Sequence, residues 1–197
     1  MSTHEVAGED RILTVPNLLS LLRLLCAPLF LWLLFGRHDR AGAAFLLGGL
    51  GATDWVDGYV ARHFNQISTL GKVIDPTADR VLLLVGVSAI LVDGAVPAWV
   101  AWVTLVRELL VAVAFLVLAA LGARRIDVQW AGKAGTFGLM FAFPFFLMGH
   151  DQGFFLHHVA RFLAWCCVVP ALIFAWYAAI TYVPMARRAL HDRPVTS

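Results

Sequence analysis

The chain has 197 residues, enough for one domain; 60% of them are hydrophobic and 14% are charged. Since a soluble domain carries about 25% charged residues, this composition and the mean hydropathy of +0.79 indicate a membrane protein. The formal net charge of +2 is too small to indicate a nucleic-acid partner. The three cysteines lie in apolar stretches without a CxxC pair, which predicts buried thiols and no disulfide framework.

Apolar stretches recur along the chain at lengths near the roughly 20 residues that a helix needs to cross a bilayer. Six such spans are predicted, over residues 15–35, 42–60, 76–95, 97–121, 134–149 and 158–183. The fifth is short, and the first is too long for a signal peptide, so we expect it to be retained. The sequence therefore predicts an all-α integral membrane protein: a polar segment over 1–14, one six-helix domain over 15–184 and a basic tail over 185–197.

Short polar connections join the spans, and Asp93-Gly94 with Pro97 predicts a tight turn between the third and the fourth. The side with both termini and the 62–75 and 122–133 loops carries nine Lys and Arg residues, against three on the other side, Arg37, Arg40 and Arg161. Because short cytoplasmic loops are rich in Lys and Arg, this difference predicts that both termini lie in the cytoplasm.

Acidic residues gather at the facing ends of the second and third spans. The four are Asp54, Asp57, Asp75 and Asp79. A charge inside a span costs about 2.5–3.5 kcal/mol on insertion scales, so their presence needs an explanation. The first two are separated by three positions and the last two by four, so each pair shares a helix face. The short connection makes the two helices antiparallel, and both pairs can then meet at the cytoplasmic end.

A divalent cation, or two, would relieve the mutual repulsion of four clustered carboxylates. Oxygen ligands without His or Cys suit Mg²⁺ or Mn²⁺. Six of the seven histidines fall outside the predicted spans and His158 stands at the very start of the sixth, which argues against a histidine-based site. Structural ion pairs such as Asp57–Arg62 are the alternative, but nearby arginines are too few for four carboxylates.

A longer pattern contains these aspartates. Residues 54–79 read D-W-V-D-G-Y-V-A-R, then eight residues, then G-K-V-I-D-P-T-A-D. This resembles the signature of the CDP-alcohol phosphatidyltransferase family, D-x2-D-G-x2-A-R-x8-G-x3-D-x3-D. Every fixed position is present: Asp54, Asp57, Gly58, Ala61, Arg62, Gly71, Asp75 and Asp79.

The resemblance implies a metal-dependent enzyme of phospholipid synthesis, which transfers a phosphatidyl group from CDP-diacylglycerol to an alcohol and releases CMP. It implies that the four aspartates bind two metal ions, Mg²⁺ or Mn²⁺, and that Asp79 is the general base. Gly58, Ala61, Arg62 and Gly71 would hold the CDP part. It further implies a homodimer in the inner membrane, with the active site open to the cytoplasm. Taken singly, Gly58 and Ala61 could serve helix packing only, and Arg62 could be an interfacial side chain.

The acceptor alcohol is less well defined. Residues 14–23 resemble the first span of bacterial phosphatidylglycerophosphate synthases and of cardiolipin synthases, and Asn17 and Arg23 are candidates to reach the active-site cavity. Asn17 could instead cap a helix. Arg107 is a candidate contact for an anionic acceptor, or forms a buried pair with Glu108.

Residues 132–136, G-K-A-G-T, resemble the G-K-x-K-T element of phosphatidylglycerophosphate synthases, with Gly135 in place of the second lysine. Lys133 is a candidate phosphate contact, or a simple interfacial lysine. The loss of one cation weakens glycerol-3-phosphate as the acceptor, and the run looks closer to actinobacterial members that resemble cardiolipin synthases, whose acceptor is phosphatidylglycerol. Both acceptors stay open at this point; inositol phosphate, serine and choline also stay open but rank lower, because the first and fifth spans resemble those of the glycerol group.

Two other functions fit intramembrane carboxylates: a divalent-cation transporter, or a membrane scaffold with a structural metal site. A transporter would place acids near mid-membrane in repeated halves, whereas here they cluster at one end of one helix pair.

Overall fold

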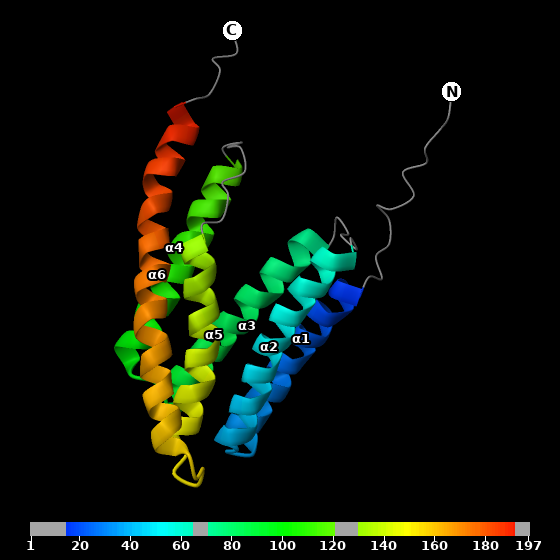
Figure 1. Ribbon diagram of the computed structural model, residues 1–197, viewed down its shortest axis with the longest axis vertical. Coiled ribbons are helices and arrows are strands. Elements are labelled where there is room, and N and C mark those ends of the chain that lie inside the picture. Colours follow the sequence, from blue (N-terminus) through cyan, green and yellow to red (C-terminus); the bar gives the residue numbers. More distant parts are fainter. Residues whose placement is uncertain (1–14, 65–70, 121–129, 192–197) are drawn as a thin grey trace, which may run out of the picture. The chain divides into compact units, whose positions relative to one another are not determined.

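Helices account for most of the described chain (Figure 1). The computed structural model describes the backbone of residues 15–64, 71–120 and 130–191, and the side chains of residues 22–53, 80–114 and 130–181. The helices are α1 (Val15–Leu31), the π-helical turn η1 (Trp32–Gly36), α2 (Arg40–Phe64), α3 (Gly71–Asp93), α4 (Ala98–Ala120), α5 (Trp130–His150) and α6 (His157–His191). The prediction of an all-α chain is confirmed for these residues.

Each predicted span falls on one helical segment, but several helices are longer than their apolar stretches. The fifth span was predicted to be short, and this was wrong, because α5 has 21 residues. Lys133 ended the apolar stretch but not the helix, since polarity marks a membrane boundary and not a helix boundary. For the same reason α6 continues to His191, through residues such as Ala, Leu and Arg that favour helix.

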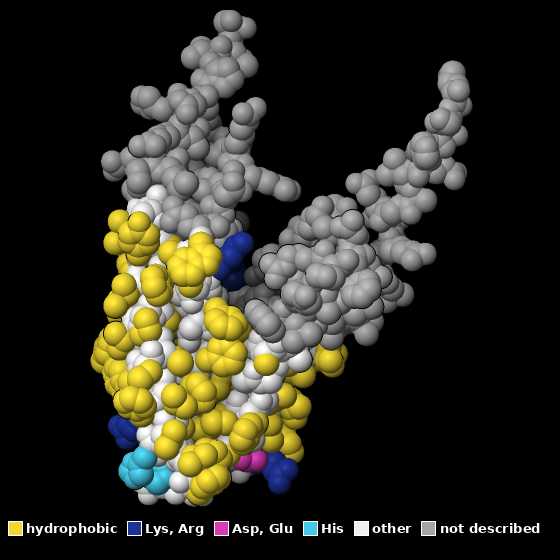
Figure 2. Space-filling model, viewed as in Figure 1, with side chains coloured by type: hydrophobic (Ala, Val, Ile, Leu, Met, Phe, Trp, Pro, Cys, Tyr) yellow, Lys and Arg dark blue, Asp and Glu magenta, His cyan; other side chains and the backbone are white. Residues whose placement is uncertain are grey.

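Two described helical stretches are long and apolar enough to cross a membrane, Trp130–His150 and His157–Thr181. Hydrophobic side chains cover most of the visible surface of α5 and α6, and histidine side chains lie at its lower end (Figure 2). Phe162 on α6, for example, is 68% exposed. An apolar exposed surface on helices of this length suits a lipid environment and is consistent with a membrane protein.

The chain divides after Asp93 into two units. In the first unit α1 packs against α2 and α3, and η1 packs against α2. Its core is formed by side chains that line the facing sides of these helices, namely Ala27, Phe30, Leu34, Ala43, Ala44, Leu47, Leu82, Val87, Ala89 and Ile90. Asp39 caps α2, since its carboxylate Oδ1 accepts from the Gly42 backbone N–H at 2.7 Å.

The second unit begins with the predicted turn. Gly94 has φ of +78°, a left-handed conformation that glycine adopts without strain, and it ends α3. Pro97 then precedes α4, and its carbonyl accepts from the Val100 N–H at 2.9 Å. In this unit α5 and α6 form a long antiparallel hairpin, and α4 packs on α6. The tight turn predicted from the sequence is confirmed.

Candidate active site

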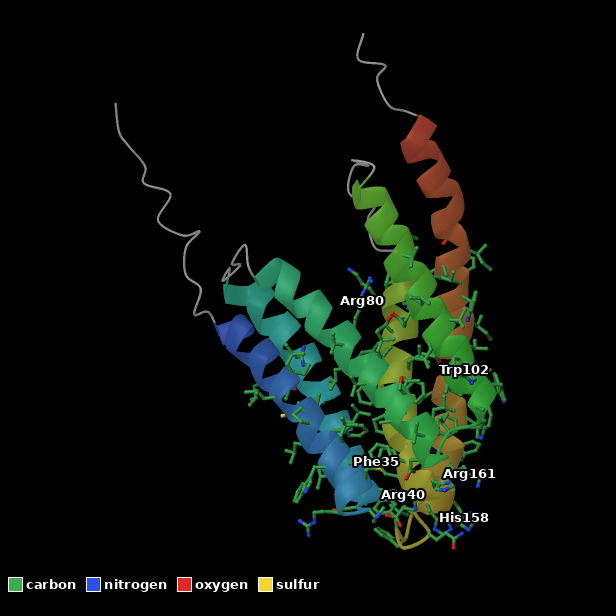
Figure 3. The ribbon with its side chains drawn as sticks, turned by 180° about the vertical axis from the view of Figure 1, so that it is seen from behind. Phe35, Arg40, Arg80, Trp102, His158 and Arg161 are labelled. Atoms are coloured by element: carbon green, nitrogen blue, oxygen red, sulfur yellow. The ribbon has the colours of Figure 1, made fainter. Side chains whose placement is uncertain are left out.

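α2 and α3 are antiparallel, and two described contacts define their register. Arg40, at the start of α2 (Figure 3), pairs with Asp93 at the end of α3: Nε lies 2.9 Å from Oδ2, and Nη2 lies 3.1 Å from Oδ1. Further along, Gly86 faces Leu47, and a Cβ on Gly86 would lie 3.6 Å from Leu47 Cδ1. Leu47 lies seven residues after Arg40, and Gly86 lies seven residues before Asp93. The two contacts are therefore one heptad apart on both helices.

The signature residues occupy the other end of this helix pair. Five of them stand on the last turns of α2, and three on the first turns of α3. In order they are Asp54, Asp57, Gly58, Ala61, Arg62, Gly71, Asp75 and Asp79. The third span was predicted to begin near Asp75, but α3 begins at Gly71, so Asp75 and Asp79 both lie inside the helix. The side chains of all eight, and of Asn17 on α1, lie outside the described part, so their shared site stays a prediction.

Among the described side chains, no group of three or more His, Cys, Asp or Glu residues could hold a metal ion. His63 lies within α2, and His157 and His158 begin α6. Arg23 on α1, a candidate for the active-site cavity, is only 3% exposed.

Arg107 and Glu108 form a buried ion pair on α4, with exposures of 4% and 7%. Nη1 of Arg107 donates to the Glu108 carboxylate, and its Nε donates to the backbone carbonyl of Ala175 on α6 at 3.4 Å. These contacts tie α4 to α6 and occupy Nε and Nη1, two of the three guanidinium nitrogens that an anionic acceptor could use. They favour the structural interpretation of Arg107; its role as an acceptor contact stays a prediction.

Gly135 on α5 lies against the backbone of α6. A Cβ at this position would lie 2.7 Å from the Ala175 nitrogen and 2.8 Å from its Cα, closer than real Cβ contacts come. Gly138 is similarly close to Ala171, at 2.7 Å from its Cβ. Lys133, in contrast, is exposed on the first turn of α5. The glycine at 135 is therefore required by close helix packing, which sequence reasoning missed.

Small residues at spacings of three and four were the available signal for this packing. Gly132, Gly135 and Gly138 stand three apart on α5, while Ala171 and Ala175 stand four apart on α6. Such spacing brings membrane helices into backbone contact.

The family model for CDP-alcohol phosphatidyltransferases matches residues 13–183. The chain belongs to the CDP-alcohol phosphatidyltransferase family. It is therefore an enzyme of phospholipid biosynthesis. Of the three functions considered from the sequence, the family supports the transferase.

Two curated transferases illustrate the range of the family. A Streptomyces coelicolor protein named cardiolipin synthase (CMP-forming) is 39% identical over 184 residues, which cover 91% of this chain and 85% of that protein. The Escherichia coli CDP-diacylglycerol–glycerol-3-phosphate 3-phosphatidyltransferase is 30% identical over 188 residues, which cover 91% of this chain and 98% of that protein. The two names differ in the acceptor, which the family match alone leaves open.

Proposed function

We propose that this protein transfers the phosphatidyl group of CDP-diacylglycerol to phosphatidylglycerol, forming cardiolipin and releasing CMP. The hydroxyl oxygen of the acceptor forms a bond to the phosphorus that bears diacylglycerol, and the bond from that phosphorus to the CMP oxygen breaks. The hydroxyl proton passes to a carboxylate, the role we assign to Asp79.

The register of α2 and α3 supports a common site for the aspartates. Residues seven apart lie on nearly the same face of a helix, about 10 Å further along. One heptad beyond the Leu47–Gly86 contact, the same register brings position 54 to the level of position 79. Asp54 and Asp79 thus continue the row that begins with Arg40 and Asp93, and Asp57 and Asp75 follow within about one turn.

Carboxylates from two adjacent helices fit a divalent-metal centre. The donor set is four aspartates without a neighbouring Cys, which suits Mg²⁺ or Mn²⁺ and provides enough oxygens for two ions. When bound, such ions neutralise phosphate charge and align the reacting oxygens. We assign Asp54, Asp57, Asp75 and Asp79 as the ligands, and Gly58, Ala61, Arg62 and Gly71 as the residues that hold the CDP part.

The observation that carries the choice of acceptor is the burial of Gly135. With Ala175 nitrogen 2.7 Å from where a Cβ would stand, a lysine cannot occupy position 135 without separating α5 from α6. This chain therefore lacks the second cation of the G-K-x-K-T element, while Lys133 keeps the first. A single exposed lysine suits the diester of phosphatidylglycerol better than the doubly charged phosphate of glycerol-3-phosphate. The name of the Streptomyces relative agrees with this choice.

Glycerol-3-phosphate is the second candidate, supported by the retained Lys133 and by the name of the Escherichia coli relative. Purified enzyme given labelled CDP-diacylglycerol and one acceptor at a time separates the two. We expect labelled cardiolipin with phosphatidylglycerol, and little phosphatidylglycerophosphate with glycerol-3-phosphate. The reverse product pattern would overturn the assignment of the acceptor but not the reaction class.

We further propose a multi-pass protein of the inner membrane with six spans, both termini in the cytoplasm and the aspartates facing the cytoplasm. The excess of Lys and Arg on the side of the termini, nine against three, supports this orientation. A homodimer is proposed from the resemblance to the family.

A further inference from the structure

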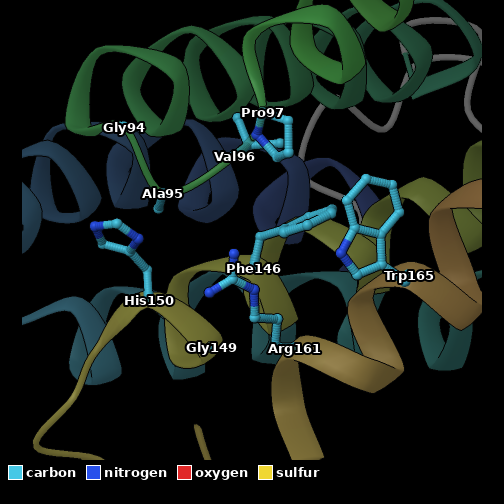
Figure 4. A pocket seen from close by; sticks show the side chains of 9 residues that line it. All are labelled: Gly94, Ala95, Val96, Pro97, Phe146, Gly149, His150, Arg161 and Trp165. Atoms are coloured by element: carbon cyan, nitrogen blue, oxygen red, sulfur yellow. The ribbon is translucent and has the colours of Figure 1, made fainter. Parts of the chain in front are cut away.

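A pocket of about 240 Å³ opens in the second unit, at the end where α5 meets α6. The turn of residues 94–97 forms one side of it, the last two turns of α5 another, and the first three turns of α6 a third (Figure 4). Phe146 and Trp165 form an aromatic wall, with ring centroids 5.5 Å apart, and Trp99 stacks on the outside of Trp165 at 6.0 Å. Aromatic side chains therefore form one wall of the pocket.

The ionisable side chains that line the pocket are His150 and Arg161. In Figure 4 the guanidinium group of Arg161 points toward the turn of residues 94–97, beside the His150 ring. Among the residues that the structure describes, neither side chain has an ion-pair or hydrogen-bond partner. The neighbouring carboxylate of Asp151 accepts from the Gly153 backbone N–H at 2.9 Å within the hairpin loop.

The backbone reinforces the positive character of this end. Both α4 and α6 begin here, and the N-terminus of a helix carries a partial positive charge. Gly149 lets α6 approach closely, since a Cβ there would lie 2.9 Å from Arg161 Cα. The guanidinium is thus carried on a firmly packed part of the helix. His150 and Arg161, which have no described partner, and the two helix N-termini all favour an anion as the ligand of this pocket.

The pocket lies at the level of lipid head groups. α5 has 21 residues, so it is about 32 Å long, close to the roughly 30 Å hydrocarbon thickness of a bilayer. Its last residue, His150, then lies at one interface. Trp99 is 54% exposed beside the pocket, as expected for an aromatic residue at the membrane–water boundary.

We propose that this pocket binds the phosphate-bearing head group of an anionic phospholipid. Arg161 donates to phosphate oxygens as a planar two-pronged donor, His150 contacts the same group, and Phe146 with Trp165 covers the glycerol carbons. A volume of about 240 Å³ holds a head group and leaves the acyl chains in the bilayer.

The pocket is distinct from the proposed active site. α3 carries Asp75 and Asp79 near its start and reaches the pocket turn at its end, after 23 residues or about 34 Å. The chain thus enters the pocket turn from the end of α3 opposite to the aspartates, and none of the residues that line the pocket belongs to the signature. The orientation proposed above, with both termini in the cytoplasm, assigns this lipid to the outer leaflet. The binding of the lipid to the pocket does not depend on that orientation.

Binding of phosphatidic acid to the purified full-length protein in uncharged detergent tests the proposal, without CDP-diacylglycerol. Phosphatidic acid has a phosphate but no head-group hydroxyl that could accept a phosphatidyl group, so failure here is separate from failure of the proposed reaction. We expect Arg161→Gln to weaken this binding at least tenfold, and His150→Ala at least threefold. Arg37→Gln is the matched control, because Arg37 is an exposed arginine whose described contact is with the Trp32 ring, and it should bind normally.

Phosphatidylcholine and inorganic phosphate complete the experiment. We expect phosphatidylcholine to bind at least tenfold more weakly than phosphatidic acid, and inorganic phosphate at equal concentration not to displace the lipid. Unchanged affinity in either folded pocket variant would overturn the proposal. Equal binding of phosphatidylcholine would overturn the choice of an anionic lipid, and displacement by inorganic phosphate would overturn the choice of a lipid.

Discussion

Arg40 and Asp93 join the start of α2 to the end of α3 through two hydrogen bonds, at 2.9 and 3.1 Å. The Asp93 side chain is only 8% exposed, whereas that of Arg40 is 35% exposed. Burial separates the Asp93 carboxylate from water, so the Arg40 guanidinium supplies hydrogen bonds that water would otherwise provide. The pair also holds the register on which the proposed position of the aspartates, at the other end of the same helices, depends.

Arg40→Ala should destabilise the protein, because it leaves the buried Asp93 carboxylate without this partner. A lost hydrogen bond to a charged group costs roughly 1.5–3 kcal/mol, and partial exposure of Arg40 places the expected loss at the low end. Arg37→Ala is the control, since the described contact that it removes is a cation–π contact with Trp32. Denaturant unfolding in detergent measures both. Equal losses in the two variants would contradict the structural role of the Arg40–Asp93 pair.

The extended register predicts which cysteines can be cross-linked. In a background with the three native cysteines replaced, Asp54→Cys with Asp79→Cys should form a disulfide or be bridged by a short bifunctional reagent. Leu47→Cys with Gly86→Cys should do the same, because these two residues lie in contact. Mass spectrometry of the digested protein measures the yield.

The mismatched pair is Asp54→Cys with Val81→Cys, which moves one cysteine about 200° around α3. We expect at least fivefold less product from it than from the matched pair. A higher yield from the mismatched pair would mean that α2 and α3 change register before the signature. The proposed metal centre would then lose its geometric support.

Gly135→Ala should separate α5 from α6, since its Cβ would meet the Ala175 backbone at 2.7 Å. Overpacking of this kind costs about 1–3 kcal/mol. The matched control is Gly49→Ala on α2, where a Cβ meets nothing within 4 Å. That substitution should stabilise the protein by about 0.5–1 kcal/mol, because alanine favours helix over glycine. Thermal unfolding of both variants gives the comparison.

Gly135→Lys extends this test to the acceptor. We expect the variant to be less stable than Gly135→Ala and to gain no activity with glycerol-3-phosphate. A stable Gly135→Lys protein that forms phosphatidylglycerophosphate would show that packing does not exclude the second lysine. The burial of Gly135 would then no longer support phosphatidylglycerol as the acceptor.

Asp79→Asn should lower CMP release at least a thousandfold while leaving the protein folded, because an amide cannot accept the acceptor proton. Nucleotide binding should fall much less, since the amide keeps the shape of the carboxylate. Removal of divalent metal with a chelator should stop wild-type turnover as well, and Mg²⁺ or Mn²⁺ should restore it. Turnover within tenfold of wild type in Asp79→Asn would exclude Asp79 as the general base.

The helices were predictable because apolar length and turn residues act locally. Asp93-Gly94 predicted the end of α3 correctly, and the observed φ of Gly94 explains why. Helix ends were less predictable, since Lys133 is charged and the segment after Pro184 is basic, yet both continue a helix. The aspartates were predicted to form a site from their spacing and from the resemblance to the family signature, and that site stays a prediction. The contact of Gly135 with Ala175 was not predicted, because a single sequence does not show which of several small residues will meet across two helices.

Glu108→Gln should be the most destabilising of these substitutions, because it leaves the Arg107 charge buried with only the Ala175 carbonyl as a described partner. Breaking a buried ion pair by removing one partner costs about 3–5 kcal/mol. Replacing both residues, as Arg107→Met with Glu108→Leu, should recover most of that loss, since apolar side chains of similar volume often substitute for a buried pair. Unfolding in detergent and transfer activity are measured together. A stable double variant with near-normal activity would make Arg107 a tie between α4 and α6, whereas a stable double variant with a strongly raised KM for the acceptor would make it an acceptor contact.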